Sequence, residues 1–296
     1  MCVVAVKYFS NIGWVGVKNR DRNYDTKLKI VQSNRKNVQR LYIDDEYTRW
    51  TEGLNEYGLC ILSATFSVKS DEKEGDEIAN FTKKRKEGYM SPDGKKIRDA
   101  LFLKDPLDAI EYLQYQELAG ATYVFNQKDC YLLEGGFTEK KIFNRNRRYI
   151  SKIQKIENYS CRTNHGILLP QLGYKKDAAD PKLLKSRKSS EKRLESVKDS
   201  VSATNTYTKM MNALSVKPYD DPFLNPIRVG DIKKGDMVTT GQIMLIPNTN
   251  TMHYRPIYST ITANYHKLNS TISKTYFEIV SDRRLLSFKD YNDIKN

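Results

Sequence analysis

The residue with the clearest potential for chemistry is Cys2, which directly follows Met1. Removal of Met1 would leave one residue that carries both a thiol and a free α-amine. An α-amine titrates at roughly pH 7.7–8.0, so it can act as the base that activates its own thiol. The alternative is an ordinary buried cysteine in a first strand, because free cysteine is among the most buried residue types.

A hairpin is expected to bring charged residues beside Cys2. Apolar residues 2–6 and 14–17 flank a Ser-Asn-Ile-Gly turn, as the two strands of a hairpin would. The second strand runs into a polar segment that contains Arg20 and Asp21. Antiparallel pairing of these strands would place both residues alongside Cys2.

Length and composition indicate a globular protein without a membrane span. The chain has 296 residues, which suits one large domain or two small ones. It shows no apolar run that could cross a membrane and no signal peptide. Its 4 cysteines and 3 histidines follow no metal-ligand spacing, so neither a metal nor another cofactor is predicted. Sparse, scattered cysteines favour a reducing, cytoplasmic location.

The net charge of +14 is the main oddity of the composition. It suggests an anionic partner such as nucleic acid, an acidic metabolite or a membrane surface. Basic stretches at 82–98 and 174–193 motivate the nucleic-acid alternative. The other interpretation is a solvated, lysine-rich surface that aids solubility.

Patterning along the chain predicts strands first, helices in the middle, and strands again at the end. Segment 70–92 is interpreted as a charged, exposed insertion, 134–136 as a turn, and 175–188 as a basic, irregular linker. This order predicts packed sheets with helices outside, in a single domain over 1–296. Further strands are expected at 27–33, 41–43, 59–66, 121–125, 130–133, 147–155, 159–163, 239–246 and 252–258, and helices at 91–101, 105–120, 189–199 and 205–214.

Five short segments in this order resemble a known enzyme family. They are Cys2, Asn-Arg-Asp at 19–21, Gly-Leu-Asn-Glu-Tyr-Gly-Leu at 53–59, Thr-Asn-His at 163–165 and Ser-Glu-Lys-Arg at 190–193. Together they resemble the cysteine N-terminal nucleophile (Ntn) hydrolases, in the group of choloylglycine (bile salt) hydrolase, penicillin V acylase and isopenicillin N acyltransferase. Members carry G-R-N-x-D or N-R-D-x, G-M-N-E-x-G-L, T-N-[SH] and S-x-x-R segments behind an exposed cysteine.

The resemblance implies an α+β fold, a four-layer αββα sandwich with mostly antiparallel sheets. It also implies a role for each matching residue. Cys2 would be the nucleophile, Arg20 would favour its thiolate, and Asp21 would orient the α-amine. Asn164 would donate to the oxyanion, and Arg193 would support the site from a helix start.

Three further positions are candidates, and two of them, Asn23 and Thr65, depart from the family pattern. Many members place the acidic residue three positions after the arginine, which is Asn23 here, so either Asp21 or Asn23 could hold the α-amine. Thr65 stands where bile salt hydrolases have another oxyanion-hole asparagine, and its hydroxyl or a nearby N–H would substitute. His165 is interpreted as structural or substrate-lining, because the α-amine already supplies a base.

The predicted activity is hydrolysis of a linear, non-peptide amide through a Cys2 thioester. The alternative within the same chemistry is an acyltransferase, and the alternative of another class is a basic nucleic-acid-binding protein. The expected partner is a small-molecule amide, with an anionic one favoured by the basic chain; no membrane is expected, and a homo-oligomer is left open.

Overall fold

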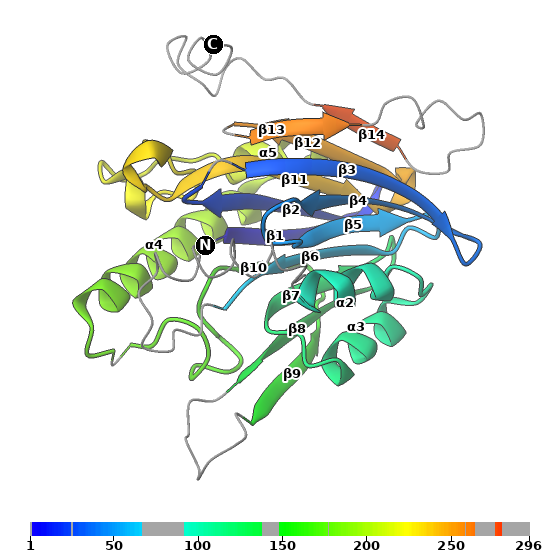
Figure 1. Cartoon of the computed structure of the whole chain (residues 1–296), viewed down its shortest axis with the longest axis horizontal. Coiled ribbons are helices and arrows are strands. Elements are labelled where there is room, and N and C mark those ends of the chain that lie inside the picture. Colours follow the sequence, from blue (N-terminus) through cyan, green and yellow to red (C-terminus); the bar gives the residue numbers. More distant parts are fainter. Residues whose placement is uncertain are drawn as a thin grey trace.

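The computed structural model describes residues 2–24, 26–66, 92–137, 148–176, 178–257, 259–263 and 276–279. Within these residues the protein is a mixed α/β structure with two sheets and a small number of helices (Figure 1). The predicted insertion at 70–92 lies almost wholly outside the described residues.

One sheet has six strands among the described residues. Their spatial order is β10 (Tyr159–Arg162), β1 (Cys2–Phe9), β2 (Gly13–Arg22), β11 (Val238–Ile246), β12 (Thr251–Pro256) and β14 (Tyr276–Ile279). All neighbours pair antiparallel except β12 and β14. The opening hairpin is therefore confirmed, and Gly13 begins its second strand at a φ of 84° that favours glycine.

The other sheet has eight strands among the described residues. Their order is β13 (Ser259–Ala263), β3 (Thr26–Arg35), β4 (Val38–Asp45), β5 (Thr51–Asn55), β6 (Cys60–Ala64), β7 (Gly120–Phe125), β8 (Cys130–Phe137) and β9 (Tyr149–Lys155). Only β13 and β3 pair parallel. This long meander brings the ends of β4 and β5 opposite β2.

Helices cover both sheets. The α-helices described are α2 (Pro92–Ala100), α3 (Pro106–Tyr115), α4 (Pro181–Ala203) and α5 (Met210–Ala213), and the short 3-10 turns are η1 (Tyr207–Lys209), η2 (Pro222–Leu224), η3 (Ile232–Lys234) and η4 (Pro247–Thr249). The helix predicted to start at Asp105 is confirmed as α3, and the Asp105 carboxylate caps it by accepting from the N–H groups of Leu107 and Asp108. Among the described residues, none of these helices has the length and apolar character needed to cross a membrane.

Three buried hydrophobic clusters hold these elements together. The first lies between the sheets and takes one face of β1, including Val4 and Val6. The second packs the other face of β1, including Val3, against α4 and α5. The third packs α2 and α3 on the eight-stranded sheet, for instance through Ile110. Strand alternation in β1 thus divides its side chains between two cores.

Some predicted elements are wrong. The basic stretch 175–188 was expected to be irregular, but α4 begins within it at Pro181. The expected turn at 134–136 lies inside β8. The helix expected to continue to Gly120 ends at Tyr115, and Gly120 begins β7.

Candidate active site around Cys2

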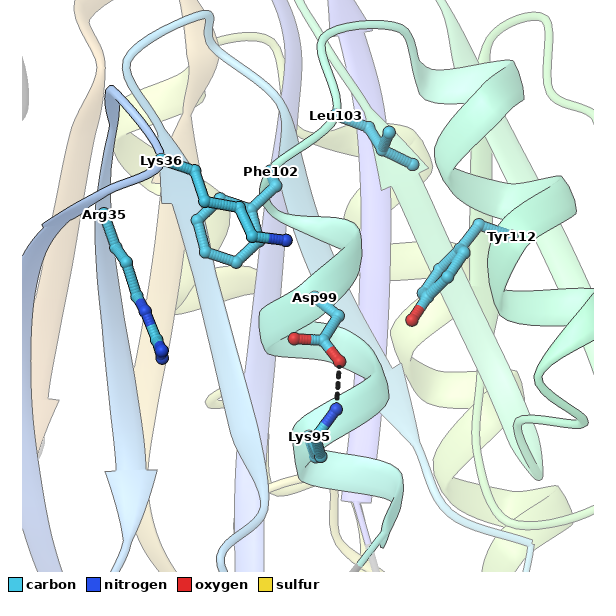
Figure 2. Close-up of a pocket in the computed structure, with 7 residues that line it drawn as sticks. All are labelled: Arg35, Lys36, Lys95, Asp99, Phe102, Leu103 and Tyr112. Carbon is cyan, nitrogen blue, oxygen red and sulfur yellow. Dashed lines mark hydrogen bonds and ion pairs between the residues drawn. The ribbon is translucent and has the colours of Figure 1, made fainter.

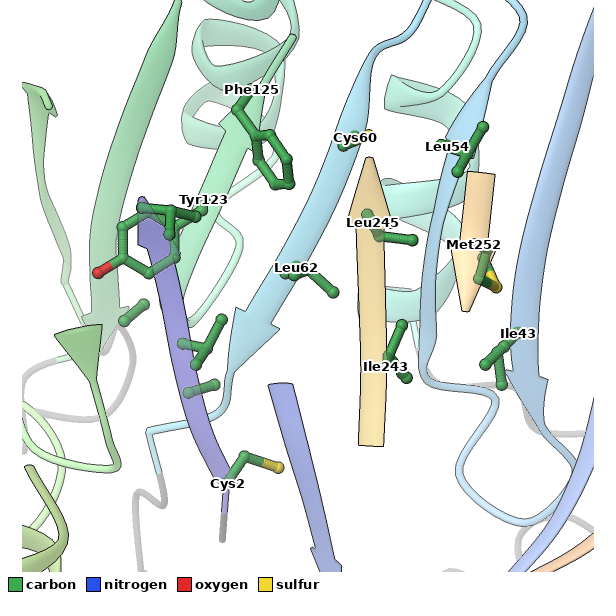
Figure 3. Packing of buried hydrophobic residues seen from close by; sticks show 14 of the residues in the cluster. Cys2, Ile43, Leu54, Cys60, Leu62, Tyr123, Phe125, Ile243, Leu245 and Met252 are labelled. Carbon is green, nitrogen blue, oxygen red and sulfur yellow. The ribbon is translucent and has the colours of Figure 1, made fainter. Parts of the chain in front are cut away.

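Cys2 stands at the start of β1, directly opposite Arg20 of β2. Its side chain is on the face that enters the cluster between the sheets, near the end of that cluster (Figure 3). Only 1% of Cys2 is exposed. The hairpin thus brings the charged end of β2 alongside Cys2.

The guanidinium that contacts the thiol belongs to Arg22. Its Nη1 lies 3.5 Å from Cys2 Sγ. Arg20, which was predicted to sit beside the thiol, donates instead from Nη2 to Asp45 at 2.9 Å and from Nη1 to Glu52. Residues two apart on a strand share a face, so both arginines point between the sheets. The carboxylates of the facing sheet bind Arg20 directly, while Arg22 reaches the thiol and lies 3.6 Å from Asp45 Oδ2 through its Nε.

The Cys2 thiol is acidic for a buried cysteine. Burial alone would raise its pKa, but the positive charges of Lys18, Arg22 and the N-terminal amine together outweigh burial and lower the pKa from 9.0 to about 6. A thiol with such a pKa is mostly thiolate at pH 7, and the thiolate is the nucleophilic form. The remaining cysteines differ, because burial raises the pKa of Cys60 and Cys130 well above the ordinary value and that of Cys161 to about 12.

Asn164 contacts the backbone nitrogen of Cys2. The Cys2 N–H donates to Asn164 Oδ1 at 2.9 Å, and Arg193 Nη2 donates to the same oxygen at 3.2 Å. Asn164 Nδ2 donates to the backbone carbonyl of Thr65 at 2.8 Å. Two donors on one side and a carbonyl on the other fix which way the amide points. The oxyanion roles expected of Asn164 and of the Thr65 hydroxyl stay predictions.

A hydroxyl and imidazole cluster holds Asn164 in place. The Asn164 N–H donates to Ser190 Oγ at 3.0 Å, and the same oxygen lies 2.8 Å from His165 Nδ1. Thr163 Oγ1 donates to the Ser190 carbonyl at 3.0 Å. The segments around 163–165 and 190–193, which are distant in sequence, therefore meet beside Cys2.

His165 is neutral at physiological pH. Burial, together with the positive charges of Arg187 and Arg193, lowers its pKa to about 3. A neutral imidazole at 4% exposure, bonded to Ser190, suits a structural role better than proton transfer near pH 7.

Replacing His165 with asparagine should flatten the acid limb of the stability curve. The folded pKa of about 3 lies below the ordinary value of 6.5, so the unfolded chain takes up this proton first as the pH falls. Stability due to neutral His165 is complete above pH 6.5 and is lost towards pH 3, at up to about 1.4 kcal/mol per pH unit. Urea unfolding between these pH values checks this. The same replacement at His253 of β12 is the control, and an unchanged slope in the His165 variant would contradict the assignment.

Asp21 lies on the opposite face of β2 from the two arginines, towards α4. Its Oδ2 accepts from Arg193 Nη1 at 3.0 Å, and its Oδ1 accepts from Thr239 Oγ1 at 2.9 Å. Arg228 Nε lies 3.9 Å from the same Oδ2. All four residues are buried. The structure thus brings Cys2, Asn164, Arg193 and Asp21 together, and the role of Asp21 towards the α-amine stays a prediction.

The sequence analysis did not identify six residues described in this neighbourhood: Lys18, Arg22, Asp45, Glu52, Arg228 and Thr239. A usable signal existed only for Arg22, because Arg22, Asn23 and Asp25 also spell the R-N-x-D pattern. Asn23 is half-buried just after β2, and Asp25 is outside the described residues.

A surface pocket of about 500 Å³ opens elsewhere, between the β3–β4 turn and helices α2 and α3 (Figure 2). Two of its cations have partners within the pocket: Lys95 Nζ lies 2.6 Å from Asp99 Oδ2, and Lys36 Nζ lies 4.9 Å from the Phe102 ring centre. No predicted site residue lines it. Among the described residues, no group of His, Cys, Asp and Glu side chains is arranged to hold a metal.

No protein-family model matches the chain, and no curated protein matches it. Among solved structures, the chain is similar to penicillin V acylase from Agrobacterium tumefaciens, with a TM-score of 0.43 and 9% sequence identity. The alignment covers 97% of this chain and 99% of that chain. At this TM-score and identity, the similarity does not by itself establish a shared fold or a shared activity.

Proposed function

We propose that this protein is an Ntn-type amidohydrolase that cleaves a linear, non-peptide amide through an acyl thioester on Cys2. One observation carries the proposal: the thiol of Cys2 lies 3.5 Å from Arg22 Nη1 while its backbone nitrogen lies 2.9 Å from Asn164 Oδ1. A single residue thus has its two reactive groups held by separate partners. Cleavage of the peptide bond before Cys2 would complete the site.

The first step is attack of the Cys2 thiolate on the amide carbonyl. The carbon–sulfur bond forms, the carbon–nitrogen bond breaks, and the departing nitrogen takes a proton. The protonated α-amine of Cys2, adjacent to the thiol and bonded to Asn164 Oδ1, is the group that would donate this proton. Its ordinary pKa of roughly 7.7–8.0 suits a group that gives and takes protons near neutral pH.

The second step is release of the acyl group. Water gives a proton to the now neutral α-amine and attacks the thioester, which frees a carboxylic acid and restores the thiolate. Asn164 Nδ2 carries two N–H donors, of which one bonds Thr65, and we assign oxyanion stabilisation to this amide. A lost oxyanion donor typically costs about 3–4 kcal/mol of transition-state stabilisation.

The packing supports an αββα arrangement. One hydrophobic cluster lies between the two sheets, a second joins α4 and α5 to the six-stranded sheet, and a third joins α2 and α3 to the eight-stranded sheet. This is the order of layers expected of an Ntn hydrolase, and Cys2 is the first residue of a strand that has neighbours on both sides.

An acyltransferase would share the first step and use an amine in place of water in the second. The active-site residues are the same for both, so product analysis with added amine distinguishes them. Binding of nucleic acid to the basic surface stays a separate prediction, and steep salt dependence of retention on immobilised DNA or RNA would test it.

The proposal predicts that activity depends on a free amine at Cys2. A chain with a cleavable N-terminal extension is assayed before and after cleavage that leaves Cys2 first, against para-nitroanilides of varied acyl groups. We expect turnover only after cleavage, because the extension blocks the amine. Equal turnover by the extended chain would contradict the proposed role of the amine. If the cleaved chain neither turns over amide and thioester substrates nor becomes acylated on Cys2, the proposed function is contradicted.

A further inference from the structure

A buried cluster of charges lies on the inner face of β2 beside the thiol. Lys18, Arg20 and Arg22 occupy alternate positions, so their side chains share this face. From the facing sheet, Glu52 of β5 bonds both Lys18 and Arg20, and Asp45 of β4 accepts from Arg20 at 2.9 Å. Arg22 is 12% exposed, and the other four side chains are at most 1% exposed.

The positive and negative charges of these five side chains do not balance. Neighbouring cations lower the pKa of Glu52 and Asp45 despite burial, so both are carboxylates at neutral pH. Tyr24, whose hydroxyl donates to Asp45 at 3.0 Å, stays neutral, since burial raises its pKa to about 12. Three cations therefore face two anions. Within the described residues, the Cys2 thiol is the acid that lies against this cluster, through Arg22.

We propose that the Cys2 thiolate is the third anion of this cluster, formed without the α-amine acting as its base, and that Lys18 is a positioning residue that sets the balance of charge. Lys18 acts through Glu52: by neutralising that carboxylate, it leaves Arg20 and Arg22 facing the single carboxylate of Asp45, and the thiolate balances the remaining positive charge. This inference rests on the proposed function of Cys2 as nucleophile. Under this proposal the α-amine transfers a proton to the leaving group and takes one from water, but it does not deprotonate the thiol.

The groups on the other side of Cys2 do not offset the effect of Lys18 and Arg22 on the thiol. Asp21 raises the pKa of the thiol, but it is bonded to Arg193 of α4 and lies near Arg228 of the loop after η2. His165, in the loop after β10, is neutral. The positive charges of Lys18 and Arg22 remain the larger influences, after burial, on the thiol.

The direct test is a pH titration of the thiolate by ultraviolet absorbance, with the Cys2→Ser protein subtracted. It needs neither substrate nor access to the thiol, and the other three cysteines stay protonated because burial raises their pKa values. The extended chain and the chain that begins at Cys2 should both titrate well below the ordinary thiol value of 9.0. A midpoint near the ordinary value of 9.0 in the extended chain would overturn the inference, whether or not the cleaved protein turns over amides.

Charge variants test the role of Lys18. Lys18→Met leaves two cations and two carboxylates, so the midpoint should rise by about one pH unit or more. Adding Glu52→Gln restores an excess of one cation and should return the midpoint towards that of the unmodified protein. Lys29→Met is the control, since Lys29 pairs with Glu46 at the surface. Urea unfolding checks that each variant is folded. A midpoint that is unchanged in Lys18→Met, or that rises further in the double variant, would overturn the inference.

Discussion

Replacing Cys2 with alanine should lower kcat/KM for any amide substrate by about four orders of magnitude or more, because the nucleophile is lost. Cys2→Ser should retain little of the activity, since a serine hydroxyl is too weak an acid for Arg22 and Lys18 to keep ionised. The measurement is steady-state hydrolysis of the para-nitroanilide that the unmodified protein cleaves best.

The matched control for Cys2→Ala is Cys161→Ala. Cys161 is equally buried, at 1% exposure, and pairs with Ala5 of the same strand β1. Its thiol has a pKa of about 12, so its removal should alter kcat/KM less than about tenfold. Cys2→Ala with activity near that of the unmodified protein, in material free of the parent chain, would contradict the assignment of the nucleophile.

Replacing Asp21 with alanine should destabilise the fold by about 3–5 kcal/mol, the typical cost of removing one partner from a buried ion pair. Arg193 and Arg228 both face this carboxylate, and all three residues are at most 1% exposed. Without it, two buried guanidiniums would repel each other; burial and Arg193 already lower the pKa of Arg228 to about 9.

Urea unfolding with a constant m value measures the effect of Asp21→Ala. The control is Asp199→Ala on the exposed side of α4, which should change stability by less than about 0.5 kcal/mol. If both variants unfold at the same urea concentration, Asp21 does not hold the two arginines as described.

Local signals in the sequence identified many of the elements, but they misjudged one glycine and the start of one helix. Asp105 followed by Pro106 was recognised as a helix start, whereas Asp180 followed by Pro181 was not, because basic residues surround it. Gly135 is typical of a turn by its local sequence, yet it lies within β8, where a side chain would collide with the Tyr149 hydroxyl. That collision is a tertiary contact, which no local pattern reveals.

The part of the site that lies in short sequence motifs was predictable. Asn164 and Arg193 were picked out by their segments and lie beside Cys2 and Asp21. The sequence alone does not show which of two arginines on one face of β2, Arg20 or Arg22, contacts the Cys2 thiol. The choice depends on Glu52 and Asp45, which reach Arg20 from the other sheet. Charge pairing between sheets is set by the fold as a whole.

The central claim is that Cys2, freed from the residue before it, carries the acyl group. The most direct measurement is the intact mass of the protein quenched in acid during turnover of a slowly hydrolysed amide or thioester. We predict a species that begins at Cys2 and is heavier by the mass of one acyl group, which fragmentation locates on Cys2 and which disappears in the Cys2→Ala variant. Turnover with no acyl adduct under excess substrate, or an adduct formed from an amide on a chain that still carries Met1, would contradict the account.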